Sequence, residues 1–360
     1  MSQLRTSIGL ATAAAFLLTA AACGGDEAGG DGDTPLVGVI LPDSASSDRW
    51  ETADRKYLEA AFEAADVDYD IQNAQGSRED FQTIADQMLT SGVNVLITVN
   101  LDSGTGATVI ENAKAQGVAT IDYDRLTEGG GADYYVSFDN ETVGRFQGEG
   151  LVQCLEGVEN PLVAELNGSP TDNNATLFKN GYDSVLDPLY ESEEFTKGPD
   201  EWVTDWDNAQ GGTIFDQMLT DTGAEIDGVL AANDDLAHAV ITVLERNGLN
   251  GTVPVTGQDA TLQGLQNLLT GDQCMTVYKP VEEEANAAAE LAVALANGET
   301  PDTGFSVTDP VSEEEVPSVL LDPVAITVDN IQTVIDHDYV DPEALCADEY
   351  AELCAEAGLQ

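Results

Sequence analysis

Residues 36–41 read LVGVIL, an uninterrupted apolar run of the length of one strand. Such a run is typical of a strand that is buried on both faces of a parallel sheet. The segment that follows, residues 49–65, places its apolar side chains at helical spacing and so predicts an amphipathic helix, with Trp50, Ala53, Tyr57, Ala61 and Phe62 on one face. A buried strand followed by such a helix predicts the first unit of an α/β fold.

The same alternation of strand and helix continues along the chain, pauses after Gly157 and then starts again. We predict strands in the first series at residues 67–73, 93–99, 118–123 and 134–138, and in the second at residues 162–166, 226–231, 253–256 and 275–278. Two consecutive series predict two doubly wound, parallel-sheet α/β lobes, and three chain crossings near Ser137, Pro280 and Asp322 are expected to join them as a hinge.

The N-terminus carries an export signal. Arg5 precedes an apolar run of small residues that is too short to span a membrane, and residues 1–22 are therefore predicted to be a signal peptide. The small residues before Cys23 are typical of a lipoprotein cleavage site, which predicts a lipid on Cys23; an ordinary secretory signal with an incidental cysteine is the alternative. Residues 23–34 are rich in Gly and Asp and are expected to form the lipid anchor and a flexible linker.

The charge of the chain is strongly acidic. There are 12 Lys and Arg residues against 67 Asp and Glu residues, for a formal net charge of −55. A nucleic-acid partner is excluded because such binding depends on cationic contacts to phosphate. We interpret the excess acid as a solvating surface in a salt-tolerant setting. In a chain with so few bases, Arg49, Arg125 and Lys279 are candidates for specific roles.

Four cysteines remain after Cys23, and an even number in an exported chain predicts disulfides. Cys346 and Cys354 close a short loop, so we pair them, and Cys154 pairs with Cys274 by elimination. No metal site is expected, because the spacings do not suit zinc and the chain has 2 histidines. No cofactor is expected either.

Polar and aromatic residues recur where the predicted strands end. Carboxylates and amides can satisfy the donor and acceptor of each sugar hydroxyl, Arg and Lys supply further donors, and aromatic rings stack on the apolar faces of a sugar. A single Asp or Asn at such a position is explained by helix capping. Its recurrence at nearly every strand end, together with Trp and Arg, favours a sugar site between the lobes.

Seven motifs carry a family resemblance: Arg49-Trp50, Tyr123-Asp124-Arg125, Ser137-Phe138-Asp139-Asn140, GSPTDNNA (168–175), Asn233-Asp234, GQDA (257–260) and TVYKP (276–280). In this order they resemble the periplasmic xylose-binding proteins and the multiple-sugar-binding proteins of ABC importers, over residues 36–340. The resemblance implies the periplasmic-binding-protein type I fold and a ligand site made of Arg49, Trp50, Asp124, Arg125, Asp172, Asn174, Trp206, Asn233, Asp259 and Lys279. For Trp50, which also lies on the apolar stripe of its helix, a place in the core is an equal alternative.

The resemblance also implies the organisation and partners of the protein. The N-terminal lobe is expected at residues 34–137 plus 281–321, the C-terminal lobe at 138–280 plus 322–345, and a tail without a recognised counterpart at 346–360. A lipid-anchored monomer outside the cytoplasmic membrane is expected to bind xylose or a related pentose or hexose and to deliver it to an ABC permease. Because some relatives serve chemosensory systems, a receptor is a further expected partner. The first loop, residues 43–48, is closer to the multiple-sugar relatives, so strict xylose specificity is not implied.

Three other functions are alternatives to sugar delivery. A glycoside-processing enzyme is disfavoured, because 2 histidines leave no Ser-His-Asp or Cys-His set and no phosphate-binding loop follows the first strand. A binding protein for another small polar ligand, or a sugar sensor that docks to a receptor, remains open. A sugar-responsive repressor core is excluded by the export signal and by the lack of DNA-binding helices before the first strand.

Overall fold

The LVGVIL segment forms β1 (Leu36–Leu41), which pairs in parallel with β2 (Asp68–Asn73) on one side and β3 (Val95–Thr98) on the other. The computed structural model describes residues 34–359, so the predicted signal peptide, the lipid on Cys23 and most of the linker lie outside the described residues. β1 is buried at every position after Leu36, as expected for a strand covered on both faces.

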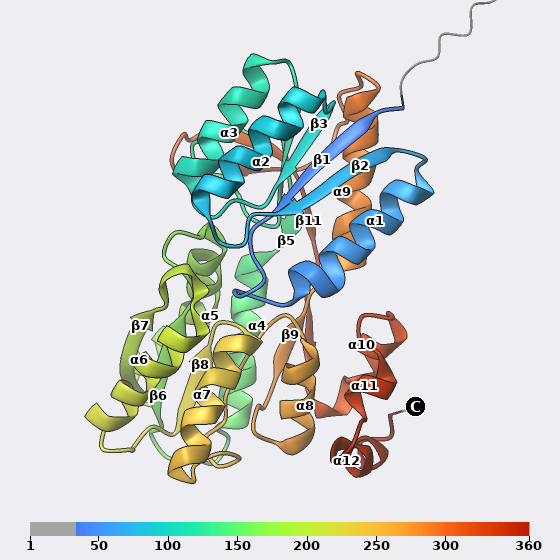
Figure 1. The fold of residues 1–360 in the computed structure, drawn as a ribbon. Coiled ribbons are helices and arrows are strands. Elements are labelled where there is room, and N and C mark those ends of the chain that lie inside the picture. The colour runs from blue at the N-terminus through green and yellow to red at the C-terminus, as the bar shows by residue number, and fades with distance from the viewer. Residues whose placement is uncertain (1–33, 360) are drawn as a thin grey trace, which may run out of the picture. The chain divides into compact units, whose positions relative to one another are not determined.

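A seven-stranded sheet is the centre of the first lobe (Figure 1), with strand order β10-β11-β5-β4-β3-β1-β2. The strands not yet given are β4 (Ala119–Tyr123), β5 (Tyr134–Phe138), β10 (Ser306–Thr308) and β11 (Glu315–Leu321). One face packs on η1 (Trp50–Asp54), α1 (Arg55–Ala64) and α9 (Val281–Ala296), and the other on α2 (Arg78–Ser91) and α3 (Ser103–Ala115). All strand pairs are parallel except the pair of β10 with β11.

The second lobe contains a three-stranded parallel sheet of order β7-β6-β8 and a separate antiparallel pair of β9 with β12. Its strands are β6 (Leu162–Asn167), β7 (Thr196–Trp202), β8 (Gly228–Ala231), β9 (Thr276–Tyr278) and β12 (Val324–Ile326). Its helices are α4 (Asn140–Cys154), α5 (Asn173–Glu191), η2 (Thr204–Trp206), α6 (Asn208–Asp221), α7 (Asp234–Asn247) and α8 (Leu262–Thr270). The chain passes between the two lobes after β5, after β9 and between β11 and β12.

A C-terminal segment packs beside α8 (Figure 1). It consists of η3 (Val328–Asn330), α10 (Gln332–Asp336), α11 (Pro342–Leu345) and α12 (Tyr350–Glu356). Ile331, Val334 and Leu345 are buried there against Leu265 and Leu268 of α8. None of the helices within residues 34–359 is both long and apolar enough to cross a membrane.

The α/β prediction is confirmed, and most predicted strands are present to within two residues. The prediction of a strand at 253–256 is wrong. Only Val255 makes a bridge, to Val229, because Pro254 lacks the N–H that a ladder of hydrogen bonds needs. β7 was missed because its sequence, TKGPDEW, reads as a loop. A proline is tolerated there because β7 is an edge strand. Residues 275–278 do not close a parallel sheet but pair antiparallel with β12.

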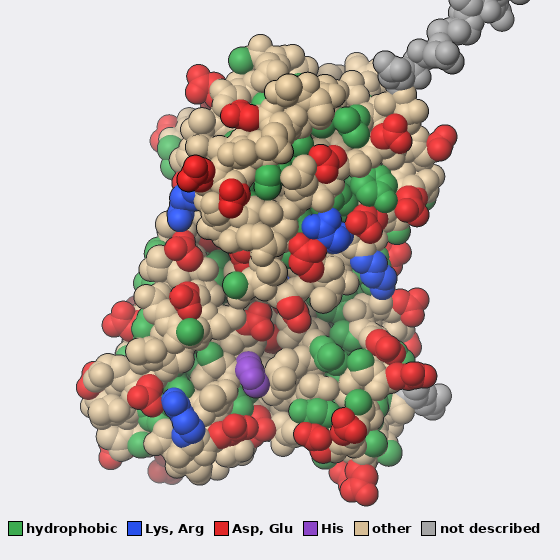
Figure 2. All heavy atoms as spheres, in the orientation of Figure 1, with side chains coloured by type: hydrophobic (Ala, Val, Ile, Leu, Met, Phe, Trp, Pro, Cys, Tyr) green, Lys and Arg blue, Asp and Glu red, His purple; other side chains and the backbone are tan. Residues whose placement is uncertain are grey.

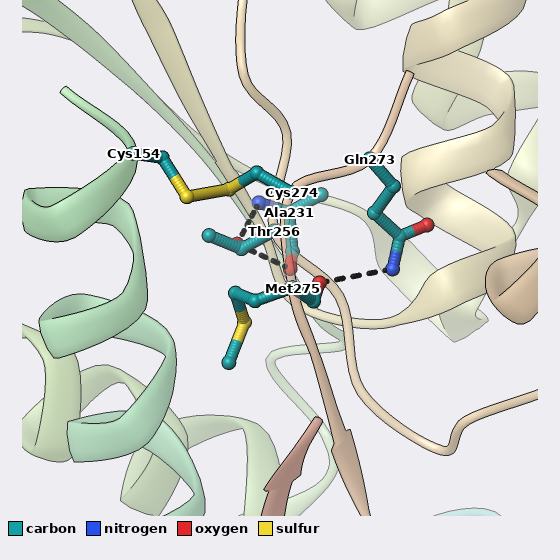
Figure 3. Close-up of a disulfide and its surroundings, with 6 residues drawn as sticks. All are labelled: Cys154, Ala231, Thr256, Gln273, Cys274 and Met275. Carbon is teal, nitrogen blue, oxygen red and sulfur yellow. Dashed lines mark hydrogen bonds between the residues drawn. A yellow bond between two sulfur atoms is a disulfide. The ribbon is translucent and has the colours of Figure 1, made fainter. Parts of the chain in front are cut away.

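The structure contains both predicted disulfides. Cys154, at the end of α4, is bonded to Cys274, which lies just before β9 (Figure 3). Cys346 is bonded to Cys354 within the C-terminal segment. Beside the first disulfide, the Thr256 hydroxyl contacts the N–H and C=O groups of Ala231 and so compensates in part for the missing ladder (Figure 3).

The two disulfides should differ in their effect on stability. They close loops with sequence separations of 120 and 8 residues, for which the chain-entropy model gives about 5 and about 2.5 kcal/mol. We therefore expect Cys154→Ser/Cys274→Ser to lower the free energy of unfolding more than Cys346→Ser/Cys354→Ser, as measured by denaturant titration without reductant. Two free thiols in the unreduced wild-type protein would contradict the long disulfide.

Candidate functional site

The candidate site is a pocket where strand ends of the two lobes face each other. All ten residues predicted from the sequence line this one pocket: Arg49, Trp50, Asp124, Arg125, Asp172, Asn174, Trp206, Asn233, Asp259 and Lys279. Sequence reasoning missed four further lining residues, namely Ser46, Ser47, Phe178 and Gln258. Gln258 lies inside the GQDA motif, and Phe178 is four residues after Asn174 on α5, so both positions could have been found from their neighbours.

Helix starts place several of these side chains. The Asn233 oxygen accepts a hydrogen bond from the Leu236 N–H (2.9 Å) and caps α7, while its amide donates to the carbonyl of Ser46 (3.0 Å) in the other lobe. Asp172 likewise caps α5 through the Asn174 N–H (3.0 Å). Capping and a place in the site are therefore not alternatives, because the cap uses one polar atom and leaves the other facing the pocket.

Arg49 is the centre of the charged network. Its side chain is 1% exposed and its guanidinium donates to the Asp54 carboxylate from both Nε and Nη2, each at 2.8 Å. Nη2 also lies 3.3 Å from Glu284 and 3.2 Å from Asp124, and Nη1 lies 3.7 Å from Asp259. Burial alone would lower the pKa of Arg49, but the carboxylates raise it well above its ordinary value.

Lys279 and Arg125 complete the set of buried cations. The Lys279 ammonium lies 3.1 Å from Asp259 and 3.5 Å from Asp124. Arg125 Nε lies 3.0 Å from the Asp172 carboxylate. These three cations face five carboxyl groups, those of Asp54, Asp124, Asp172, Asp259 and Glu284.

Five ionised carboxylates would leave a buried excess of negative charge, which is costly in a site shielded from water. Glu284 relieves it: burial, reinforced by Asp124, raises the pKa of Glu284 well above its ordinary value. Burial also acts against ionised Asp124, but Lys279, Arg49 and Arg125 outweigh it and lower the pKa of Asp124. The surroundings therefore favour the neutral form of Glu284, behind Arg49, and the ionised form of Asp124, on the pocket side.

Two tryptophans form apolar walls. Trp50 is 2% exposed and packs in the core of the first lobe, yet its ring also lines the pocket, 4.4 Å from the Arg49 guanidinium carbon and 5.3 Å from that of Arg125. Trp50 therefore lies in the core of the first lobe and at the pocket wall, and its contact with a sugar stays a prediction. Trp206 donates from Nε1 to Asp172 (3.1 Å) and lies directly against Gly168, where a Cβ atom would collide with the indole ring.

Hydrogen bonds cross between the lobes at the pocket. The Ser47 hydroxyl donates to Asp259 (3.1 Å), and the Asn174 amide donates to both the carbonyl (2.9 Å) and the carboxylate (3.0 Å) of Asp124. At the rim, Arg78 bonds to Asp205 (3.2 Å). The lobes are thus held together by polar contacts around the pocket in the arrangement that the structure shows.

Five buried polar atoms of the lining take part in no hydrogen bond within residues 34–359: Arg49 Nη1, Asp124 Oδ2, Arg125 Nε, Gln258 Oε1 and Asp259 Oδ1. All except Gln258 Oε1 lie within 3.7 Å of an oppositely charged group and are therefore ion-paired. Because buried polar groups in proteins are normally hydrogen-bonded as well, these donors and acceptors, next to aromatic rings, suit a ligand with several hydroxyl groups and apolar C–H faces. The residues described contain no cluster of His, Cys, Asp or Glu arranged to hold a metal ion.

The outer surface is acidic, as the composition predicts. Figure 2 shows Asp and Glu side chains spread over the face in view, with few Lys and Arg among them. Among the Lys and Arg residues of the described part of the chain, Arg49, Arg125 and Lys279 are buried, and all three line the pocket. The acidic surface therefore says little about the ligand, whereas the buried bases do.

The chain is similar to known binding proteins over most of its length. Residues 37–300 match the family described as "Periplasmic binding protein domain". The chain is 34% identical over 302 residues to the D-xylose-binding periplasmic protein of Escherichia coli, covering 84% of this chain and 89% of that protein. It is 32% identical over 320 residues to the multiple sugar-binding periplasmic receptor ChvE of Rhizobium radiobacter, with coverages of 84% and 90%.

Solved structures show the same fold. An ABC transporter solute-binding protein from Clostridium phytofermentans, with bound β-D-glucose, superposes with a TM-score of 0.78 at 26% identity and covers 86% of this chain and 99% of its own. A carbohydrate transporter solute-binding protein from Chloroflexus aurantiacus, in complex with D-glucose, gives 0.77 at 29% identity, with coverages of 86% and 98%.

A buried aspartate next to the pocket should make stability depend on pH. Burial raises the pKa of Asp234 to about 7, although Thr276 and Gln273 donate hydrogen bonds to it. An unfolded Asp titrates at ~4, so between these two pKa values the folded state binds more protons than the unfolded state. The contribution of Asp234 to the free energy of unfolding therefore falls as pH rises, by at most about 1.4 kcal/mol per pH unit. We expect Asp234→Asn to flatten the wild-type decline between pH 4 and 7 (roughly these two pKa values).

The measurement is urea unfolding at several pH values. Asp216→Asn is the matched control, because the Asp216 side chain is 59% exposed on α6 of the same lobe. Equal pH slopes for wild type and Asp234→Asn would contradict the raised pKa.

Proposed function

We propose that this chain, which belongs to the periplasmic binding protein family, binds xylose or a closely related pentose or hexose in the pocket between its two lobes and delivers it to an ABC permease. It is a non-enzymatic solute-binding protein of the sugar- and polyol-binding class. The observation that carries the proposal is the buried pocket lined by all ten expected residues, with charged donors and acceptors that lack hydrogen bonds beside aromatic rings.

The residue roles follow from the chemistry of each group. Arg49 and Lys279 donate to sugar hydroxyls, Asp124, Asp172 and Asp259 accept from them, and Asn174 and Asn233 can do both. Trp50 and Trp206 supply the flat apolar surfaces on which a sugar ring stacks. Such a site discriminates against a ligand that lacks one hydroxyl, because a buried protein group then stays unpaired.

Binding would be coupled to lobe closure. Arg49 and Asp124 belong to the first lobe, and Asn233 and Asp259 to the second, so a ligand that contacts both stabilises the closed arrangement. We propose the crossings near Ser137, Pro280 and Asp322 as the hinge, with the lobe boundaries predicted from the sequence. The closed form would be the one that the permease, or a chemosensory receptor, recognises.

Export and anchoring complete the proposal. A lipid on Cys23 and a Gly- and Asp-rich linker would keep the two-lobed binding protein, a monomer, close to the outer face of the cytoplasmic membrane.

The ligand class can be tested by a thermal-shift screen of the mature protein, without the anchor, against monosaccharides and polyols at high and low salt. A ligand that binds the folded state alone raises the melting temperature as its concentration exceeds its Kd. We expect a large shift with xylose or a close relative. A shift with polyols alone would assign a polyol, and a protein that melts cooperatively but responds to neither class would contradict the proposal.

Two substitutions test the assigned contacts. Asp259→Ala and Asn233→Ala should each weaken sugar binding about tenfold or more, because both leave buried polar groups without partners. Asn233→Ala also removes the cap of α7. Binding is therefore measured by calorimetric titration well below the melting temperature, so that the loss of affinity is separated from a loss of stability. Asn250→Ala, at an exposed turn of the same lobe that bonds to Asp272 (3.1 Å), is the control and should bind as wild type does. Wild-type affinity in Asp259→Ala would refute that assignment.

A further inference from the structure

The C-terminal segment returns to the candidate site from behind. After η3 and α10, which are anchored on α8, residues 337–339 lie next to both the Asp259 loop and α1 of the first lobe. Tyr339 packs against the apolar clusters of both lobes. This segment contributes no side chain to the pocket lining.

Tyr339 holds the main chain of Asp259. Its hydroxyl donates to the Asp259 carbonyl (2.9 Å), and the Asp259 N–H donates to the carbonyl of Val277 (2.8 Å). Asp259 has a φ of 99° and Ala260 a φ of 50°. Such values are uncommon for residues other than glycine and persist where the surroundings enforce them, so both hydrogen bonds help to define where the Asp259 carboxylate points.

Tyr339 is itself fixed by aromatic contacts. Its ring meets that of Tyr278 edge to face at 5.0 Å, and Tyr278 also contacts His337 (5.5 Å). Tyr278 immediately precedes Lys279, whose ammonium pairs with Asp259. The segment thus supports the two positions, 259 and 279, that form one ion pair of the pocket.

The neighbouring residue contacts the other lobe. The Asp338 carbonyl accepts hydrogen bonds from the Tyr57 hydroxyl (3.0 Å) and from Lys56 (3.3 Å), both on α1. Two consecutive residues, Asp338 and Tyr339, therefore connect α1 of the first lobe to the Asp259 loop of the second. In the arrangement that the structure shows, this connection joins the two lobes outside the pocket.

We propose that residues 337–339 form a strap in which Tyr339 is a positioning residue for Asp259 and the Tyr57–Asp338 bond is a lobe-to-lobe tie outside the ligand pocket. The inference rests on the proposed function, because it gives Asp259 a ligand to bind. It assigns to the C-terminal segment a part in ligand affinity, although no atom of the strap lines the pocket.

The first test is a double-mutant cycle by calorimetric titration with the best ligand of the sugar screen. Tyr339→Phe keeps the ring and removes one hydrogen bond, so we expect affinity to fall about threefold to tenfold. Asp259→Asn should fall further, and adding Tyr339→Phe to it should cost little more, since a residue that acts through Asp259 is not additive with it. Tyr350→Phe, on α12 of the same segment, should bind as wild type does. Wild-type affinity in Tyr339→Phe, or full additivity in the double variant, would overturn the positioning role.

A second measurement needs no ligand. Hydrogen exchange of the free protein should become faster at residues 257–262 in Tyr339→Phe and stay unchanged there in Tyr350→Phe. Unchanged exchange would overturn the strap, whatever the protein binds. Faster exchange in a protein that binds no sugar would support the strap and would count against the proposed function alone.

The tie is tested separately with Tyr57→Phe. Because the Tyr57–Asp338 bond joins the lobes without touching the pocket, its loss should raise the ligand dissociation rate about threefold and leave the association rate nearly unchanged. Equal dissociation rates in wild type and Tyr57→Phe would overturn the tie.

Discussion

The buried guanidinium of Arg49 is the interaction on which the site depends. A cation removed from water must be paired and hydrogen-bonded, and Asp54 and Glu284 provide this from the first lobe alone. Asp124 and Asp259 then meet the same guanidinium from the pocket side, and Asp259 comes from the other lobe. Arg49 thus links the core of the first lobe to the contact between the lobes.

The charge balance around Arg49 explains why the pocket is polar without being strongly anionic. Arg49 and Lys279 lie beside Asp124 and Asp259, while burial raises the pKa of Glu284 and so favours its neutral form behind Arg49. A ligand with neutral hydroxyl groups can pair with such groups without adding charge, whereas an anionic ligand would face two carboxylates. The acidic exterior has no part in this balance, because its charges are solvated and screened by salt.

Much of the fold could be predicted from the sequence, since apolar strands such as LVGVIL carry strong local signals. Polar residues at strand ends indicated where a site would lie, but its particular residues were implied by the family resemblance of the seven motifs. The rest depends on tertiary context. β7 tolerates its proline because it is an edge strand. Glu284 looks in the sequence like one more acid of an exposed helix, and its burial is evident only from the structure. The link from Tyr339 to Asp259 spans 80 residues and has no local signal.

In the proposed mechanism, a sugar joins the two lobes through the charged network around Arg49. Small-angle X-ray scattering of the mature protein, recorded while the best-binding sugar is titrated, measures this closure. The radius of gyration should fall as the sugar is added and should saturate together with binding measured by calorimetry. A radius of gyration that stays constant while the sugar binds stoichiometrically would contradict it.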